Sequence, residues 1–160
     1  MKRVIAILLG VVLALLSAAA ASADKPVREF LPAGDFTLTG VCPFPVGVEV
    51  TTNNEFSTTF SDGRQLVTGA LKVRVTNLDS DESLDLNISG PGVITENSDG
   101  SVTIEAHGSW LLWFFPGDLG TGSPGQLFVN NGHFVQTFSS AGVTIDRQTG
   151  SQQDICAALA

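Results

Sequence analysis

Few residues of this chain could do acid–base chemistry, because its only two histidines are His107 and His133. Glu105 lies two positions before His107, and residues two apart on a β-strand share a face. The carboxylate could orient or titrate the imidazole, so the pair could transfer protons in a barrel enzyme of the cyclase or isomerase type if both faced a cavity. A solvated surface pair is the favoured interpretation. His133 follows Asn131-Gly132 and is expected to be a solvated turn residue.

No further catalytic or metal-binding pattern accompanies these residues. A nucleophilic triad needs a histidine beside a nucleophile and oriented by a carboxylate, and the sequence contains no Gly-x-Ser-x-Gly elbow. Two cysteines and two separated histidines do not predict a zinc site. The sequence therefore indicates no catalytic residue, no cofactor and no metal ligand.

A short acidic segment has the residue types of a calcium site: Asp79, Asp81, Glu82 and Asp85. Carboxylate oxygens are preferred calcium ligands. The spacing does not complete an EF-hand loop, because Leu84 occupies the sixth position, where glycine is needed. A charged loop that keeps a sheet edge soluble is the favoured interpretation, with a weak calcium site as the alternative.

The aromatic residues offer the best binding chemistry. Residues 110–115 are apolar on both faces of a strand, and a glycine-rich loop follows at 116–125. Such a strand is sandwiched between two layers, or one side of it lines a pocket. In the second case Trp110, Trp113 and Phe115 would line the mouth of an apolar pocket, suited to a small apolar molecule or a docking protein. The alternative is that these aromatics are plain core.

The elements around these residues have the pattern of strands. Apolar and polar residues alternate between closely spaced turn signals, which is typical of an all-β domain. Asp62-Gly63, Asp99-Gly100 and Asn131-Gly132 predict two-residue hairpin turns and hence antiparallel pairing, since both central residues need positive φ. The expected strands are 36–39, 46–52, 55–60, 65–77, 84–88, 93–97, 101–107, 110–115, 126–129, 133–138 and 143–146.

The two cysteines, Cys42 and Cys156, predict a disulfide that closes most of the chain into one loop. The only helix expected is at 152–159, with Asp154 or Ser151 as its N-cap. Ile155 and Leu159 would then share one face of this helix. The disulfide would pin this helix to the start of the sheet.

The N-terminal segment has the pattern of an export signal. Lys2 and Arg3 precede an apolar run at 4–16, and Ala21-Ser22-Ala23 supplies the small residues of a cleavage site. We therefore expect a signal peptide at 1–23 and a single secreted domain at 24–160, with no membrane association after cleavage. A retained membrane anchor is the alternative.

Composition excludes some classes of protein. Of the 160 residues, 43 % are hydrophobic and 15 % charged, so the chain can bury a core and is not disordered. Removal of 1–23 takes away two of the eight basic residues and none of the sixteen acids, which changes the formal net charge from −8 to −10. The surplus of acids argues against nucleic-acid binding.

Several segments of the mature chain resemble small secreted proteins of actinobacteria that have no assigned activity. These segments are Cys42-Pro43-Phe44-Pro45-Val46, 69–77, Ser89-Gly90-Pro91-Gly92, Asp99-Gly100-Ser101, Gly108-Ser109-Trp110-Leu111-Leu112 and Asp154-Ile155-Cys156-Ala157-Ala158-Leu159. The overall strand layout is also similar to the eight-stranded barrel shared by allene oxide cyclase and dirigent proteins. Both resemblances imply fold and compartment only, because no catalytic residue of those families is matched.

Together these patterns predict an all-β fold, a mostly antiparallel β-barrel closed by a short C-terminal helix, with a β-sandwich as the alternative. The expected function is that of a secreted, non-enzymatic binding protein for a small apolar ligand or an extracellular protein partner. The alternatives are the cyclase- or isomerase-type barrel enzyme and an extracellular structural protein.

Overall fold

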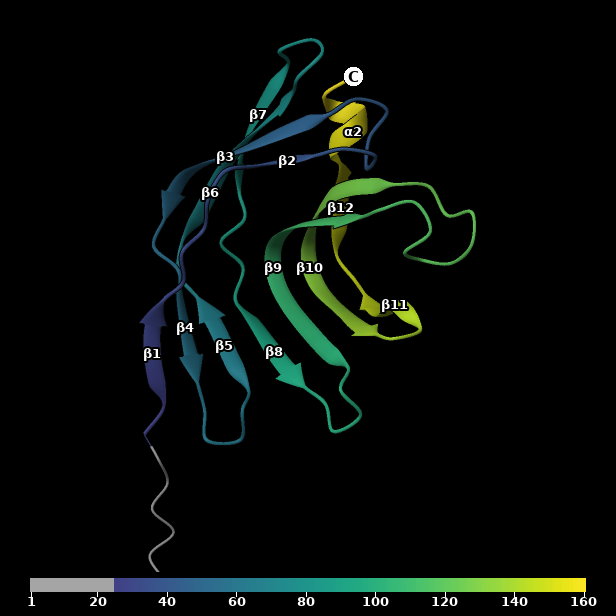
Figure 1. Cartoon of the computed structure of the whole chain (residues 1–160). Helices are drawn as coiled ribbons and strands as arrows, with labels where there is room; N and C mark the ends of the chain where they lie inside the picture. The colour runs from purple at the N-terminus through teal and green to yellow at the C-terminus, as the bar shows by residue number, and fades with distance from the viewer. Residues whose placement is uncertain (1–24) are drawn as a thin grey trace, which may run out of the picture.

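The computed structural model describes residues 25–160, so the expected signal peptide lies outside the described residues. The described chain is all-β with one short C-terminal helix (Figure 1). All strand pairs are antiparallel. The larger sheet contains, in spatial order, β1 (Val27–Phe30), β4 (Phe56–Thr59), β5 (Gln65–Thr68), β8 (Gly92–Glu96), β9 (Val102–Phe114), β10 (Gln126–Ser139) and β11 (Gly142–Gln148), with β12 (Ser151–Asp154) also on β10. The smaller sheet contains β2 (Phe36–Leu38), β3 (Val46–Asn53), β6 (Leu71–Asn77) and β7 (Ser83–Asn87). No helix within residues 25–160 is long and apolar enough to cross a membrane.

The two sheets share one long hairpin that bends between them. Strand β3 continues into β4, and β5 continues into β6, so the ribbon is paired in the larger sheet at one end and in the smaller at the other. At the bend, Asn54 N donates to Ala70 O at 2.8 Å. Gly69 has φ of 140°, and a Cβ there would lie 2.1 Å from Asn54 O. The corner therefore requires glycine, and the expected single strand at 65–77 is two strands in different sheets.

Neither sheet closes into a barrel in the part of the chain that is described. The outer strands of the larger sheet are β1 and β11, and those of the smaller sheet are β2 and β7. The preferred barrel closure is therefore not observed, and the arrangement is sandwich-like, with apolar residues packed between the sheets. Strands that pass from one sheet to the other at bends, as the ribbon does at Gly69, link the layers without closing them.

The hairpin β9–β10 is longer than its sequence indicates. Its register pairs thirteen residues of each strand without a break, and Gly132 lies opposite Gly108. The expected turn at Asn131-Gly132 is therefore wrong, as are the strand breaks expected around it. A Cβ at Gly132 would lie 2.1 Å from Thr149 O, so this glycine permits close approach of the β11–β12 link instead of a turn.

The other two predicted turns are hairpins, but with three-residue loops. In the first, Phe60 N donates to Arg64 O at 2.9 Å, and Gly63 N donates to Phe60 O at 3.0 Å. Only the glycine has positive φ, 85° at Gly63 and 82° at Gly100 in the second hairpin. This is a type I turn followed by a glycine bulge, which explains why Asp-Gly suits both positions.

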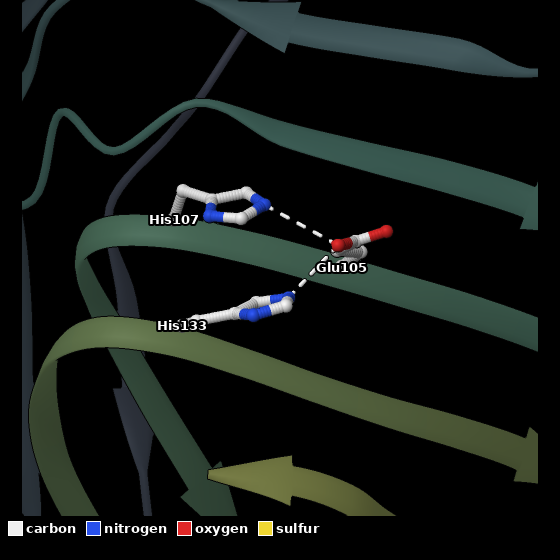
Figure 2. Close-up of side chains that lie close together, drawn as sticks. All are labelled: Glu105, His107 and His133. Carbon is white, nitrogen blue, oxygen red and sulfur yellow. Dashed lines mark hydrogen bonds and ion pairs between the residues drawn. The ribbon is translucent and has the colours of Figure 1, made fainter. Parts of the chain in front are cut away.

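Strand β9 separates two apolar cores. Leu111 packs with the smaller sheet and the C-terminal helix, while Leu112 and Phe114 pack with Phe128 and Phe134 of β10. The two-sided apolarity of residues 110–115 is thus matched by apolar packing on both faces of the strand, and residues of the same segment also line hollows. Nearer the start of β9 the outer face is polar and carries Glu105 (Figure 2).

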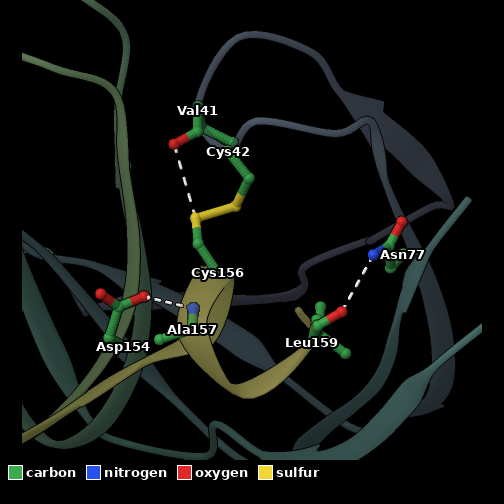
Figure 3. The surroundings of a disulfide bond; sticks show 7 residues. All are labelled: Val41, Cys42, Asn77, Asp154, Cys156, Ala157 and Leu159. Carbon is green, nitrogen blue, oxygen red and sulfur yellow. Dashed lines mark hydrogen bonds between the residues drawn. A yellow bond between two sulfur atoms is a disulfide. The ribbon is translucent and has the colours of Figure 1, made fainter. Parts of the chain in front are cut away.

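The C-terminus is held against the smaller sheet by the predicted disulfide between Cys42 and Cys156 (Figure 3). Helix α2 (Ile155–Ala158) is shorter than expected, because residues 151–154 form β12. Asp154 is the N-cap, and its Oδ1 accepts a hydrogen bond from Ala157 N at 2.9 Å. Asn77 Nδ2 donates to Leu159 O at 2.9 Å, which anchors the last turn to β6. Ile155 and Leu159, which were expected to share one face of the helix, are both buried in the core between the sheets.

The disulfide should contribute much of the stability of the fold. Its cysteines are 114 positions apart, and closing a loop of this length lowers the entropy of the unfolded chain enough to stabilise the protein by about 4–5 kcal/mol. We expect the double variant Cys42→Ser/Cys156→Ser to lose about this free energy of unfolding in urea titrations. Equal urea midpoints for the oxidised parent and the variant would contradict the prediction.

Candidate functional site

The three aromatic residues selected from the sequence line a single groove, here called the aromatic groove, of about 460 Å³. Trp113 and Phe115 are 40 % and 42 % exposed, and Phe138 of β10 is 39 % exposed beside them. Trp110 is only partly buried and lies deeper. The remaining lining residues are Ile104, Leu111, Leu112, Asp118, Gln136 and Val143. The groove is thus apolar with an exposed aromatic rim, a combination typical of ligand- or partner-binding surfaces.

A second hollow, the inter-sheet cavity, adjoins this groove. It measures about 270 Å³ and is also lined by Trp110, Leu111 and Trp113. Its other walls come from both sheets and from the links between them, and are almost entirely apolar: Leu31, Ala33, Gly34, Phe36, Val48, Val50, Val67, Leu71, Val73, Ile88 and Ile94. Since strand β9 supplies residues to both hollows, the same tryptophans would contact a ligand in either.

Glu55 is the one ionisable residue among those that line the inter-sheet cavity. It lies at the bend between β3 and β4, where its N–H donates to Asn53 Oδ1 at 2.9 Å and its carbonyl accepts from Leu31 N at 3.0 Å. The residue is only 8 % exposed, and burial raises the pKa of its carboxyl group. No side chain within residues 25–160 pairs with this carboxyl group, so it is free to meet a ligand.

Trp110 packs tightly over two glycines, Gly90 in the link before β8 and Gly92 at the first position of β8. A Cβ at Gly90 would lie 2.5 Å from its Cδ1, and a Cβ at Gly92 would lie 2.4 Å from its Cζ2. The indole N–H is buried and has no hydrogen-bond partner in the described part of the chain. A buried donor without a partner costs free energy, so a ligand oxygen that reached it would gain a strong contact.

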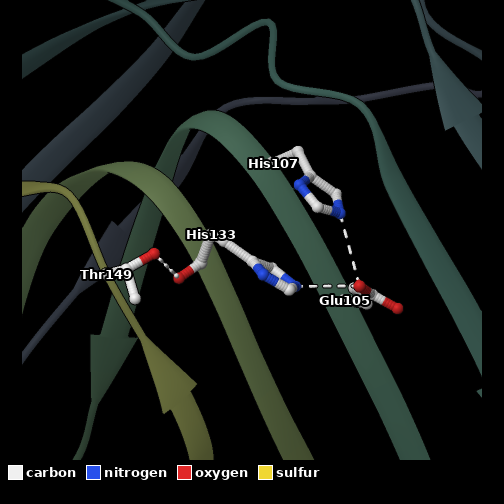
Figure 4. A network of polar contacts seen from close by, with 4 residues as sticks. All are labelled: Glu105, His107, His133 and Thr149. Carbon is white, nitrogen blue, oxygen red and sulfur yellow. Dashed lines mark hydrogen bonds and ion pairs between the residues drawn. The ribbon is translucent and has the colours of Figure 1, made fainter.

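A polar cluster lies in the first half of β9 and the facing part of β10 (Figure 4). His133 stands directly opposite His107 in the register, and the two rings stack with centroids 4.2 Å apart. Glu105 Oε1 accepts a hydrogen bond from His133 Nε2 at 2.8 Å and lies 3.3 Å from His107 Nε2. The expectation that His133 is a solvated turn residue is therefore wrong: it is a strand residue, 23 % exposed.

This cluster does not have the surroundings of an enclosed acid–base site. The side chains of Glu105 and His107 are 45 % and 52 % exposed, and neither residue lines the aromatic groove or the inter-sheet cavity. A cyclase or isomerase that works by confinement needs both groups inside a cavity. The cluster does bring three ligand-type atoms within 4.8 Å of one another, which the separation of the histidines in sequence did not indicate.

The four carboxylates of the acidic segment considered for calcium are not brought together as the residues of the polar cluster are. Asp85 accepts two hydrogen bonds from Arg74, at 2.9 and 3.1 Å, and this contact holds the pKa of Asp85 below its ordinary value. Asp81 lies in the turn before β7 with φ of 64°. Within residues 25–160, none of the four carboxylates belongs to a group of three possible ligands that lie within 4.8 Å of one another.

Sequence reasoning found the aromatic residues but missed Glu55, Gly90 and Gly92. Nothing in the sequence distinguishes Glu55 from the other fifteen acids, because its burial arises from the bend of the ribbon. The two glycines stand in the segment Ser89-Gly90-Pro91-Gly92, whose sequence does not indicate that a tryptophan packs against it. Comparison with models of known protein families, with curated proteins and with solved structures gives no match.

The contact between Trp110 and Gly92 can be tested by adding a single methyl group. We expect Gly92→Ala to displace the indole, lower the free energy of unfolding by about 1–3 kcal/mol and change the tryptophan emission spectrum. Gly34→Ala is the control, since a Cβ there has nothing within 4 Å. A Gly92→Ala protein with the emission and stability of the parent would show that the packing is loose.

The raised pKa of Glu55 predicts a pH-dependent stability. The folded state binds this proton more tightly than the unfolded chain, so stability falls as pH rises from the ordinary value of 4.5 through the raised pKa. We expect Glu55→Gln to raise the urea midpoint at pH 8 and to change it little at pH 4. Glu96→Gln, at an exposed position, is the control. A lower midpoint for Glu55→Gln at pH 8 would mean that the carboxylate is stabilising.

Proposed function

We propose that this chain is a secreted, non-enzymatic protein that binds a small apolar molecule through the inter-sheet cavity and the aromatic groove. The observation that carries the proposal is the adjacency of the two hollows, which share Trp110, Leu111 and Trp113. The inter-sheet cavity, about 270 Å³, lies just below the roughly 300–1,000 Å³ typical of small-molecule sites, and the aromatic groove, about 460 Å³, lies in the lower half of that range, so the ligand is expected to be small. The signal-like N-terminus and the disulfide support an extracellular location.

The polar groups at the cavity define the class of ligand further. A carboxyl group at Glu55 disfavours an anionic ligand such as a fatty acid, and the negative net charge of the chain disfavours its approach. A neutral or weakly basic molecule could donate a hydrogen bond to Glu55. We therefore propose a neutral or basic apolar ligand that carries one small polar group.

A protein partner is the second candidate for the same surface. Three large apolar side chains, Trp113, Phe115 and Phe138, are exposed together along the aromatic groove. Aromatic residues are enriched at the centres of protein interfaces. A partner would cover this rim without entering the inter-sheet cavity, so ligand probes distinguish the two functions.

The test uses the fluorescent probe N-phenyl-1-naphthylamine, which is apolar and uncharged at neutral pH. We expect its emission to rise on binding to the oxidised protein, and Trp113→Ala to weaken its affinity about 10-fold, or about 1.4 kcal/mol. Phe30→Ala is the matched control, because Phe30 is an exposed aromatic that lines neither hollow. The anionic probe 1-anilinonaphthalene-8-sulfonate should bind more weakly than the neutral one.

Two results would count against the small-molecule function. The first is equal probe affinity for the parent and Trp113→Ala, which would place the probe elsewhere. The second is no binding of the neutral probe at all, which would leave the exposed rim to a protein partner.

A further inference from the structure

The polar cluster of Glu105, His107 and His133 shares no residue with the aromatic groove or the inter-sheet cavity. It contains both histidines of the chain, contributed by two different strands and brought together by the register that pairs His107 with His133. Glu105 shares their face because it lies two residues before His107 on β9. The hairpin that carries them is paired over thirteen positions, so the three side chains start from a rigid support.

The spacing of the three side chains matches the coordination sphere of a small divalent ion. Zinc binds imidazole nitrogen and carboxylate oxygen at about 2.0–2.2 Å, which places neighbouring ligand atoms of a tetrahedral site about 3.4 Å apart. Here Glu105 Oε1 lies 2.8 Å and 3.3 Å from the two Nε2 atoms, and all three ligand atoms lie within 4.8 Å of one another. The two rings stack with an interplanar angle of 15°, so binding one ion through both Nε2 atoms requires the imidazoles to rotate about their side-chain bonds until the two nitrogens point at the same position.

We propose that Glu105, His107 and His133 bind a divalent transition-metal ion of the zinc class. Two imidazoles and one carboxylate suit zinc, copper and nickel, whereas calcium takes oxygen ligands. The carboxylate of Glu105 only accepts hydrogen bonds, so its present contact uses the proton on His133 Nε2. When the metal ion binds Nε2, the neutral imidazole carries its single proton on Nδ1 instead, and the Glu105 carboxylate exchanges this hydrogen bond for a bond to the metal.

The surroundings leave the metal accessible. The neighbours of Glu105 in the register are Val93 on β8 and Val135 on β10, and both are apolar. Arg147 of β11, opposite Val135, is the nearest basic residue in that register. Three protein ligands on a half-exposed surface leave at least one coordination position of the metal open. Water or an outside ligand can occupy that position, as in zinc sites with three protein ligands.

The test measures Zn²⁺ affinity by competition with a chromophoric chelator, using untagged, oxidised protein that spans residues 24–160. We expect one equivalent of Zn²⁺ to bind the parent, and His107→Gln, His133→Gln and Glu105→Gln each to weaken binding at least about 10-fold, by analogy with the loss seen when supporting groups of metal sites are removed. Glu29→Gln is the matched control: it removes the same charge from an exposed position on β1 and should keep the affinity of the parent.

A spectroscopic measurement separates this site from binding elsewhere. Electron paramagnetic resonance of the parent with one equivalent of Cu²⁺ should show hyperfine coupling to two imidazole nitrogens, and to one in either single histidine variant. Undiminished Zn²⁺ affinity in the double variant His107→Gln/His133→Gln would overturn the proposal. So would a parent spectrum with fewer than two imidazole nitrogens, a result that does not depend on whether a variant folds.

Discussion

The bend of the shared ribbon is the constraint on which the rest of the structure depends. At this point the backbones of Asn54 and Ala70 are hydrogen-bonded, and Gly69 comes so close to Asn54 that no side chain fits. A straight ribbon would extend one sheet and leave its apolar face uncovered. The bend folds the smaller sheet back over β9, which creates the inter-sheet cavity, and it buries Glu55 at the edge of that cavity.

The β9–β10 hairpin carries both proposed sites, one in each half of its length. Apolar residues of its second half, Trp110 and Trp113 above all, line hollows on both sides of the strand. Its first half is covered on one side only, and the polar side holds the Glu105 cluster. Because the backbone of one hairpin supports the apolar ligand site and the Glu105 cluster, the two sites are rigidly placed relative to each other. They use different side chains, so substitutions can abolish one site and leave the other intact.

Two polar groups at the proposed ligand site, the carboxyl group of Glu55 and the indole N–H of Trp110, are buried at a cost in free energy. Neither group has a hydrogen-bond partner among residues 25–160, and the residues around them are mostly apolar. Groups of this kind destabilise a fold unless something else satisfies them. The disulfide and the capped helix α2, which hold the C-terminus against the smaller sheet, supply stability that offsets this cost.

The sequence by itself determined the properties that depend on local patterns. Alternation of apolar and polar residues specifies strands, Asp-Gly specifies two of the turns, and Asp154 caps the helix, because each signal acts over a few neighbouring positions. Even the double-sided packing of 110–115 could be read locally. Tertiary structure alone decided the remainder: which strands change sheets, why Gly132 lies mid-strand, that Glu55 is buried and that the two histidines meet. These depend on register and on backbone approaches between distant segments, which no local pattern encodes.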